Sequence, residues 1–143
     1  MKEKEDSRES SVQALTAIFQ QGDFGLAIIE ARKVIKEHQS AAAVNILALA
    51  YKHLGEIDRS IEIYEHLLTN NPSNIMFLTN LGNIYSDQGR LTEAQKLFEK
   101  ALDVYPNHID AVLGLGNIHV VRAKYNRALQ LYEKVRREVE DIP

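Results

Sequence analysis

The sequence predicts an all-α fold made of four similar helix–turn–helix units. Apolar residues recur three or four positions apart, as Leu78, Leu81 and Tyr85 do, and this is the spacing of the buried stripe of an amphipathic helix. The same residue pattern returns every 34 positions along most of the 143-residue chain. No segment combines sustained alternation of polar and apolar residues with hairpin signals, so strands are not expected.

Two helices are expected in each unit. Their expected ranges are 8–21, 24–37, 41–54, 58–70, 75–88, 92–104, 109–122 and 126–140. Residues 1–7 are expected to form a solvated N-terminal lead-in. Residues 8–143 are expected to form one domain, with units at about 8–40, 41–74, 75–108 and 109–142.

Glycine and proline punctuate these helices. A glycine follows three of the four first helices, at Gly22, Gly55 and Gly89. Helices often end in a left-handed residue at this place, and glycine adopts that conformation without a Cβ penalty. Ala123 stands at the fourth such place, so its turn should be strained or differently shaped. Pro72 and Pro106 follow second helices, which they cannot extend.

Polar residues near the starts of second helices are candidate N-caps. Thr92 and Gln95 have the spacing of a capping box, and Asp58 and Asn126 are predicted to accept a hydrogen bond from the first turn. These residues are expected to open their helices.

Small and large residues alternate between the paired helices. Small residues stand where two helices must approach closely, as Gly82 and Ala94 do. Large ones are expected to fill the space between units: Tyr64, Phe98 and Tyr132. Leu113-Gly114-Leu115-Gly116 superficially suggests a glycine-rich loop, but it lies inside an expected helix, so close helix packing explains it better.

The best-preserved unit carries a recognisable motif. Its residues are Leu81, Gly82, Tyr85, Gly89, Ala94, Phe98, Ala101 and Pro106. This order resembles the tetratricopeptide repeat (TPR), a helix–turn–helix unit of about 34 residues with the pattern L-G-x-x-Y…A-x-x-x-F…P. Copies displaced by 34 residues lie on both sides, with a weaker one at the N-terminus, so the resemblance covers roughly residues 8 to 142.

The resemblance implies an α-solenoid in which four repeats stack as a right-handed superhelix. First helices would then line a concave groove, where members of the family bind segments of other proteins. In that register the candidate partner-binding residues are Asn45, Leu49, Lys52, Met76, Asn80, Asn83, Asp87, Leu113 and Asn117. A carboxamide both donates and accepts hydrogen bonds, so the asparagines could pair with a peptide backbone; the alternative is that each bonds only a neighbouring helix or water.

Two specialised subfamilies do not fit. Co-chaperones that hold the acidic C-terminus of heat-shock chaperones use a clamp of cations, but its places here hold uncharged or acidic residues such as Asn45, Asp110 and Gly114. O-linked N-acetylglucosamine transferases carry one asparagine per repeat at a fixed place, which only Asn80 occupies; Ile46 and Gly114 interrupt the series.

Composition disfavours several other classes. The net charge is −3 and no unit forms a basic patch, which argues against a nucleic-acid partner. No apolar run reaches the 18–20 or so residues of a membrane helix, and the charged N-terminus does not resemble a signal peptide. Cysteine is absent, which excludes disulfides and thiolate chemistry and is compatible with a reducing compartment, so a cytoplasmic location is expected.

Catalysis is not expected, and no cofactor or metal is implied. No nucleotide-binding, nucleophile-elbow or zinc-protease motif occurs. Glu62 and His66 lie four residues apart, a spacing that can chelate a metal, but two ligands do not make a site and a solvated surface pair is the simpler interpretation.

Three functions stay open at this stage. The preferred one is a non-catalytic scaffold that binds a peptide or helical segment of a partner protein. The first alternative is the repeat portion of a larger enzyme, such as a glycosyltransferase or sulfotransferase, where it would present substrate. The second is an oligomerisation element, because the last helix carries Leu129, Tyr132, Val135 and Val139 with no further helix to cover them.

Overall fold

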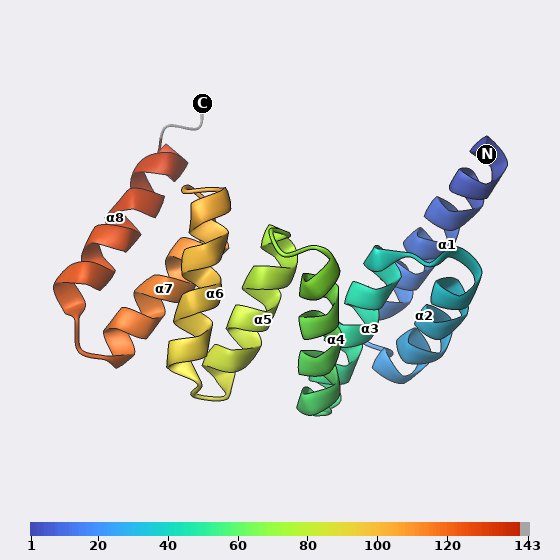
Figure 1. The fold of residues 1–143 in the computed structure, drawn as a ribbon, viewed down its shortest axis with the longest axis horizontal. Helices are drawn as coiled ribbons and strands as arrows, with labels where there is room; N and C mark the ends of the chain where they lie inside the picture. The colour runs from blue at the N-terminus through green and yellow to red at the C-terminus, as the bar shows by residue number, and fades with distance from the viewer. Residues whose placement is uncertain (141–143) are drawn as a thin grey trace. The chain divides into compact units, whose positions relative to one another are not determined.

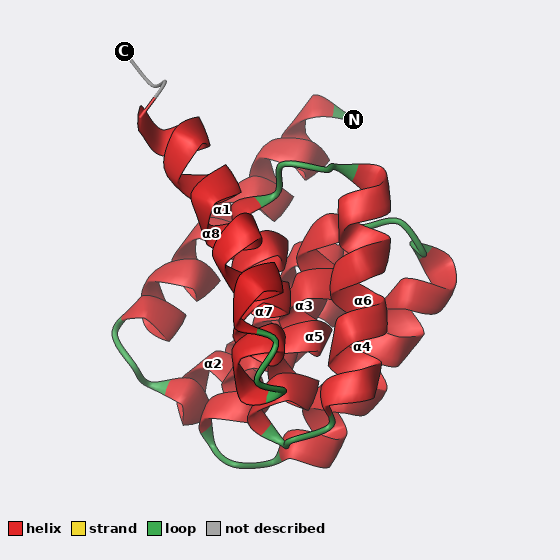
Figure 2. Ribbon diagram, turned by 90° about the vertical axis from the view of Figure 1, so that its left-hand side faces the viewer, coloured by secondary structure: helices red, strands yellow, loops and turns green. Residues whose placement is uncertain are grey.

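The computed structural model describes residues 1–140, and these form eight α-helices and no strand (Figures 1 and 2). The helices are α1 (Lys2–Gln20), α2 (Phe24–His38), α3 (Ala41–His53), α4 (Ile57–Asn70), α5 (Ile75–Asp87), α6 (Leu91–Val104), α7 (Ile109–Val121) and α8 (Tyr125–Glu140). The all-α class and the four helix–turn–helix pairs predicted from the sequence are confirmed.

The first helix is longer than the sequence predicted. It begins at Lys2 instead of about residue 8, so residues 2–7 are helical, although they are exposed to solvent. Glu3 and Glu5 lie in its first turn, where carboxylates interact favourably with the positive end of the helix dipole.

Contacts between Cα atoms divide the chain into two compact units, Met1–Leu67 and Leu68–Pro143, with the boundary near the end of α4. Unit 1 contains α1, α2, α3 and most of α4, and unit 2 contains α5 to α8. That residues 8–143 form one domain stays a prediction.

Unit 1 is built on α2, which packs against both α1 and α3. Its core contains Leu15 from α1, Ala31 from α2 and Ile46 from α3, all buried. Helix α4 joins α3 through Ser60, whose hydroxyl donates a hydrogen bond of 2.7 Å to the carbonyl oxygen of Ala48. Both residues are fully buried, so these small side chains let the two helices approach closely, as the sequence predicted.

Unit 2 is centred on the ring of Phe98 in α6. A Cβ atom added to Gly82 of α5 would lie 2.7 Å from Cε1 of this ring, and one added to Gly114 of α7 would lie 2.5 Å from its Cζ. Real Cβ atoms essentially never approach so closely. The two glycines therefore let the backbones of α5 and α7 approach the fully buried Phe98 ring, and close packing accounts for Gly114.

Helix N-caps occur at different places from those predicted. The side chains of Asp23, Ser40 and Asn74 each accept a hydrogen bond from the backbone N–H three residues later, at 3.1, 3.3 and 3.1 Å. The predicted caps are wrong, because α4, α6 and α8 begin at Ile57, Leu91 and Tyr125. Asp58, Thr92 and Asn126 consequently lie inside the first turn.

The turn between α7 and α8 has the same form as the glycine turns. Gly55 and Gly89 have φ angles of 81° and 72°, and Ala123 has a φ of 55°. The Ala123 N–H donates to Val120 at 2.9 Å and the Lys124 N–H to His119 at 2.8 Å, matching the bonds of Gly89 and Arg90 in the preceding repeat. Ala123 thus adopts a left-handed conformation in which its Cβ is strained.

Candidate partner-binding face

Two exposed rows of side chains lie on the first helices of unit 2. In α5 the row runs from Met76 to Asp87 with members three or four residues apart, so it follows one side of the helix. In α7 a row with the same spacing runs from Asp110 to Val120, and Val121 adjoins its end. We call the surface formed by these residues the α5–α7 face. It consists of Met76, Asn80, Asn83, Asp87, Asp110, Leu113, Asn117, Val120 and Val121.

The packing of unit 2 places the two rows on adjoining helices. Helices α5 and α7 contact each other, and both contact α6. In α5, Gly82 turns toward Phe98 of α6, and the row lies well round the helix from this glycine. In α7, Gly114 meets the same ring beside the row, four residues after Asp110 and three before Asn117. The six predicted site residues of unit 2 therefore lie on two adjoining helices.

The α5–α7 face mixes apolar and polar groups. Met76 is 46% exposed, Val120 42% and Val121 68%, and Leu113 is also exposed. Asn83, Asp87 and Asn117 are exposed between them, and Asn80 is half-buried. The face contains carboxylates but no lysine, arginine or histidine.

One carboxamide of the face is held in a fixed orientation. The hydroxyl of Tyr132 in α8 donates a hydrogen bond of 2.6 Å to Oδ1 of Asn117. Because its oxygen already accepts this bond, Asn117 offers a partner mainly its two N–H donors. Asn83 stands 34 residues earlier, and the corresponding second-helix residue there is Phe98, which has no hydroxyl.

The predicted site residues of unit 1 lie on α3 and are less accessible. Asn45 is 8% exposed, and its Oδ1 accepts a hydrogen bond of 2.8 Å from the hydroxyl of Tyr64. Tyr64 is fully buried, so Asn45 contributes to the packing of α4 on α3 and has little surface left for a partner. Leu49 and Lys52 are half-buried.

The sequence did not predict that tyrosine hydroxyls bond these asparagines. It assigned Tyr64, Phe98 and Tyr132 a common space-filling role. The available signal was that two of these three equivalent residues carry a hydroxyl, which must find a partner when buried. Which asparagine it reaches depends on how the two helices pack: Tyr64 bonds a residue 19 positions earlier, but Tyr132 bonds one 15 positions earlier.

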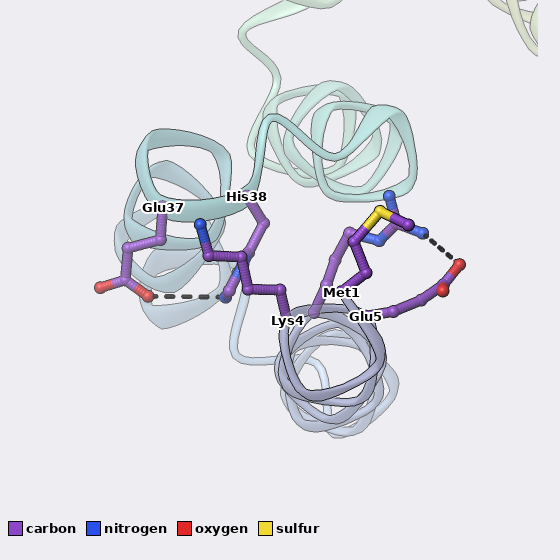
Figure 3. A pocket seen from close by; sticks show the side chains of 6 residues that line it. Met1, Lys4, Glu5, Glu37 and His38 are labelled. Atoms are coloured by element: carbon purple, nitrogen blue, oxygen red, sulfur yellow. Dashed lines mark ion pairs between the residues drawn. The ribbon is translucent and has the colours of Figure 1, made fainter.

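A separate hollow of about 290 Å³ lies between the start of α1 and the end of α2 (Figure 3). Two ion pairs occur there, Arg8–Glu5 at 3.7 Å and His38–Glu37 at 3.8 Å. In both, the partners are neighbours in the same helix, and surface pairs of this kind contribute little binding energy. This hollow offers a weaker site than the α5–α7 face.

Among the described residues, metal-ligating side chains do not gather at any other place. Within residues 1–140, no group of three or more histidine, aspartate or glutamate side chains is placed to hold a metal ion. In the same residues, no helix combines the length and apolar character needed to cross a bilayer.

Sequence comparison identifies the repeats. Profiles of the tetratricopeptide repeat match residues 41–74 and 73–137. The chain belongs to the tetratricopeptide repeat family. No curated protein matches the sequence at a significant level.

Solved structures of TPR proteins share the fold. MamA from Desulfovibrio magneticus RS-1 is 20% identical with a TM-score of 0.79, and the match covers 95% of this chain and 78% of that one. Pseudomonas aeruginosa PilF is 25% identical with a TM-score of 0.84, covering 94% and 62%. A TPR protein from Parabacteroides merdae is 19% identical with a TM-score of 0.78, covering 95% and 55%.

Proposed function

We propose that this chain is a non-catalytic TPR module that binds a segment of a partner protein on the α5–α7 face and so assembles a protein complex. One observation carries the proposal: exposed apolar side chains alternate with carboxamides on one side of two packed helices. Exposed apolar side chains gathered on one face and rimmed by polar groups are typical of interaction sites. The scaffold below it is closely packed, because Gly82 and Gly114 bring the backbones of α5 and α7 against the Phe98 ring.

The chemistry of the face favours a particular kind of partner. Met76, Leu113 and Val120 suit the apolar anchors of an amphipathic helix or an extended segment. Asn83 and Asn117 can bond the backbone or polar side chains between those anchors. Asp87 and Asp110 disfavour an acidic segment, so the partner should be neutral or basic. Micromolar affinity, about −8 kcal/mol, is expected for such a site.

The proposal extends to α3 and to the cellular location. Leu49 and Lys52 are proposed contact residues of unit 1, with Asn45 supporting the packing beneath them. The lack of cysteine is compatible with a reducing compartment, so we place the protein in the cytoplasm.

A variant of the two asparagines tests the proposal. The partner, isolated by affinity capture and identified by mass spectrometry, is titrated by calorimetry against wild type and against Asn83→Ala/Asn117→Ala. Loss of two hydrogen-bonding groups should weaken binding by roughly tenfold or more, at about 1 kcal/mol each. The free energy of thermal unfolding should fall by no more than the loss of one hydrogen bond, about 1 kcal/mol, because both residues are exposed and only the bond from Tyr132 to Asn117 is removed.

The matched control is Asn70→Ala/Asn126→Ala, which makes the same chemical change at exposed residues of α4 and α8. It should bind like wild type. Equal affinities for all three proteins would exclude the α5–α7 face as the binding site.

Self-association through α8 is a second candidate function. Tyr125 is 65% exposed, Leu129 56% and Val139 52%, so this helix presents a further apolar surface. Light scattering at tens of micromolar should then detect a dimer that Leu129→Gln/Val139→Gln converts to a monomer. A wild-type monomer at that concentration would argue against this function.

A further inference from the structure

His119 of α7 is a buried titratable group that the proposed function does not use. It is 7% exposed, and its Nδ1 is enclosed by the protein without a hydrogen-bond partner among the described residues. A doubly protonated ring is disfavoured here, because the N–H at Nδ1 would have neither water nor a hydrogen-bond acceptor.

The corresponding residues of the two preceding repeats are tyrosines that contact arginines. The Arg59 guanidinium lies 5.3 Å from the ring centroid of Tyr51, and that of Arg90 lies 4.1 Å from the ring centroid of Tyr85. A cation over a tyrosine ring is attracted by its π electrons. Cations close to this position therefore stabilise those repeats.

In the fourth repeat cationic side chains keep the corresponding places, but His119 replaces the tyrosine. Lys124 in the turn and Arg127 in α8 correspond to Arg90 and Arg59 displaced by multiples of 34 residues. Arg122, at the end of α7, is held in place because its guanidinium donates hydrogen bonds to Gln95 and Thr92 of α6.

The electrostatic balance at the ring disfavours protonation. Burial lowers the pKa of His119 most, followed by the positive charges of Arg127, Lys124 and Arg122, and only the Glu99 carboxylate of α6 opposes them. Within residues 1–140 these are the charged groups that act on the ring: one from α8, one from the turn, one from α7 itself and one from α6.

We propose that His119 makes the α7–α8 hairpin an acid-sensitive element, which opens when the buried imidazole takes up a proton. The added charge would stand unbonded beside three cations, and opening α8 lets water solvate it. A tyrosine in the same place, as in the second and third repeats, cannot respond in this way.

The direction of the effect follows from linkage. The folded-state pKa lies below the ordinary value of about 6.5 that the unfolded chain has. The stability that neutral His119 contributes is therefore complete above about pH 6.5 and is lost as the pH falls from there to the folded-state pKa. Below that pKa no further change is expected from this residue.

Opening of this hairpin would also reach the α5–α7 face. The hydrogen bond from Tyr132 to Asn117 joins α8 to α7, so separating the helices releases the Asn117 carboxamide. Acid should then weaken partner binding. This last step rests on the proposed function, but the acid-sensitive opening does not.

Hydrogen exchange of α8 at pH 7.5 and pH 5.0, corrected for the intrinsic rates, tests the proposal. Wild-type protection in α8 should fall by about tenfold for each unit by which the folded-state pKa lies below its ordinary value. His119→Tyr introduces the residue of the other repeats and should lose less than about twofold. The control His66→Tyr replaces an exposed histidine of α4 and should behave like wild type.

An equal loss of α8 protection in His119→Tyr and wild type would overturn the proposal. If that variant fails to fold at pH 7.5, an NMR titration of the His119 ring in wild type decides instead: an apparent pKa at or above the ordinary value would overturn it. Acid-sensitive exchange without acid-sensitive partner binding would refute the coupling between this hairpin and the α5–α7 face and leave the acid-sensitive opening intact.

Discussion

The two hairpins of unit 2 have the same fold but unequal local residues. The α5–α6 hairpin has an Asn74 cap, a Gly89 turn and a buried Phe98. The α7–α8 hairpin has His108 without a cap bond, Ala123 in a left-handed turn and a half-buried Tyr132. Both hairpins nevertheless form the same turn with corresponding hydrogen bonds. Packing between helices therefore specifies this fold more strongly than caps and turn residues do, and the fourth repeat should be the less stable one.

The largest expected difference concerns the second-helix aromatic residues. Phe98→Ala should lower the free energy of unfolding by about 3–5 kcal/mol, because it removes a fully buried ring that both Gly82 and Gly114 contact. Tyr132→Ala should cost less, because that ring is half-buried. Chemical denaturation measures both, and a larger cost for Tyr132→Ala would invert the comparison.

Substitution of the glycines that contact these two rings gives a second comparison of the hairpins. Gly82→Leu should overpack the α5–α6 hairpin and cost about 1–3 kcal/mol or more, because Phe98 has no free space to move into. Gly116→Leu meets the Tyr132 ring at a similar 2.5 Å, but this half-buried ring can move toward solvent. Melting curves should show the smaller loss for Gly116→Leu, and the opposite order would mean that the repeats are wrongly aligned.

The N-caps of α5 and α7 can be compared by two substitutions, one of which should stabilise the protein. The Nδ1 of His108 is buried without a partner among residues 1–140, at the place where Asn74 caps α5. His108→Asn should raise the free energy of unfolding by about 1 kcal/mol, and Asn74→Ala should lower it by about the same amount. Denaturant titration of both proteins checks this pair. No gain from His108→Asn would mean that α7 does not lack a cap.

The turns should show the smallest effect. Ala123→Gly relieves the left-handed strain of about 1–2 kcal/mol but gives the unfolded chain more freedom, so a net gain of about 0.5–1 kcal/mol is expected. Gly89→Ala should be destabilising, because it places a Cβ at a left-handed φ of 72°. Calorimetric melting temperatures measure the two changes, and a loss in Ala123→Gly would show that the turn is not strained.

The sequence predicted the repeat, the helix pairs and the left-handed turns because these depend on residues within one repeat. It missed the starts of α4, α6 and α8 by one residue. Those starts follow from the turn backbone itself: the carbonyls of Glu56, Arg90 and Lys124 already accept a helical hydrogen bond from the residue four positions on. The polar side chains that follow therefore do not set the helix boundary.

The candidate site was predictable only in part. Exposure of Met76, Asn83 and Asn117 follows from their position along a helix. The burial of Asn45 does not, because it depends on a tyrosine hydroxyl that reaches it from α4. The unpartnered nitrogen of His119 likewise becomes evident only once the neighbouring helices are in place.

A photocrosslinking comparison tests the central claim most directly. Benzoylphenylalanine is placed at Leu113, on the α5–α7 face, or at Lys96, an exposed residue of α6 outside that face. Each protein is irradiated with the purified partner. The account predicts a partner adduct from Leu113 and none from Lys96. Adducts from Lys96 alone, or equally from both positions, would contradict it.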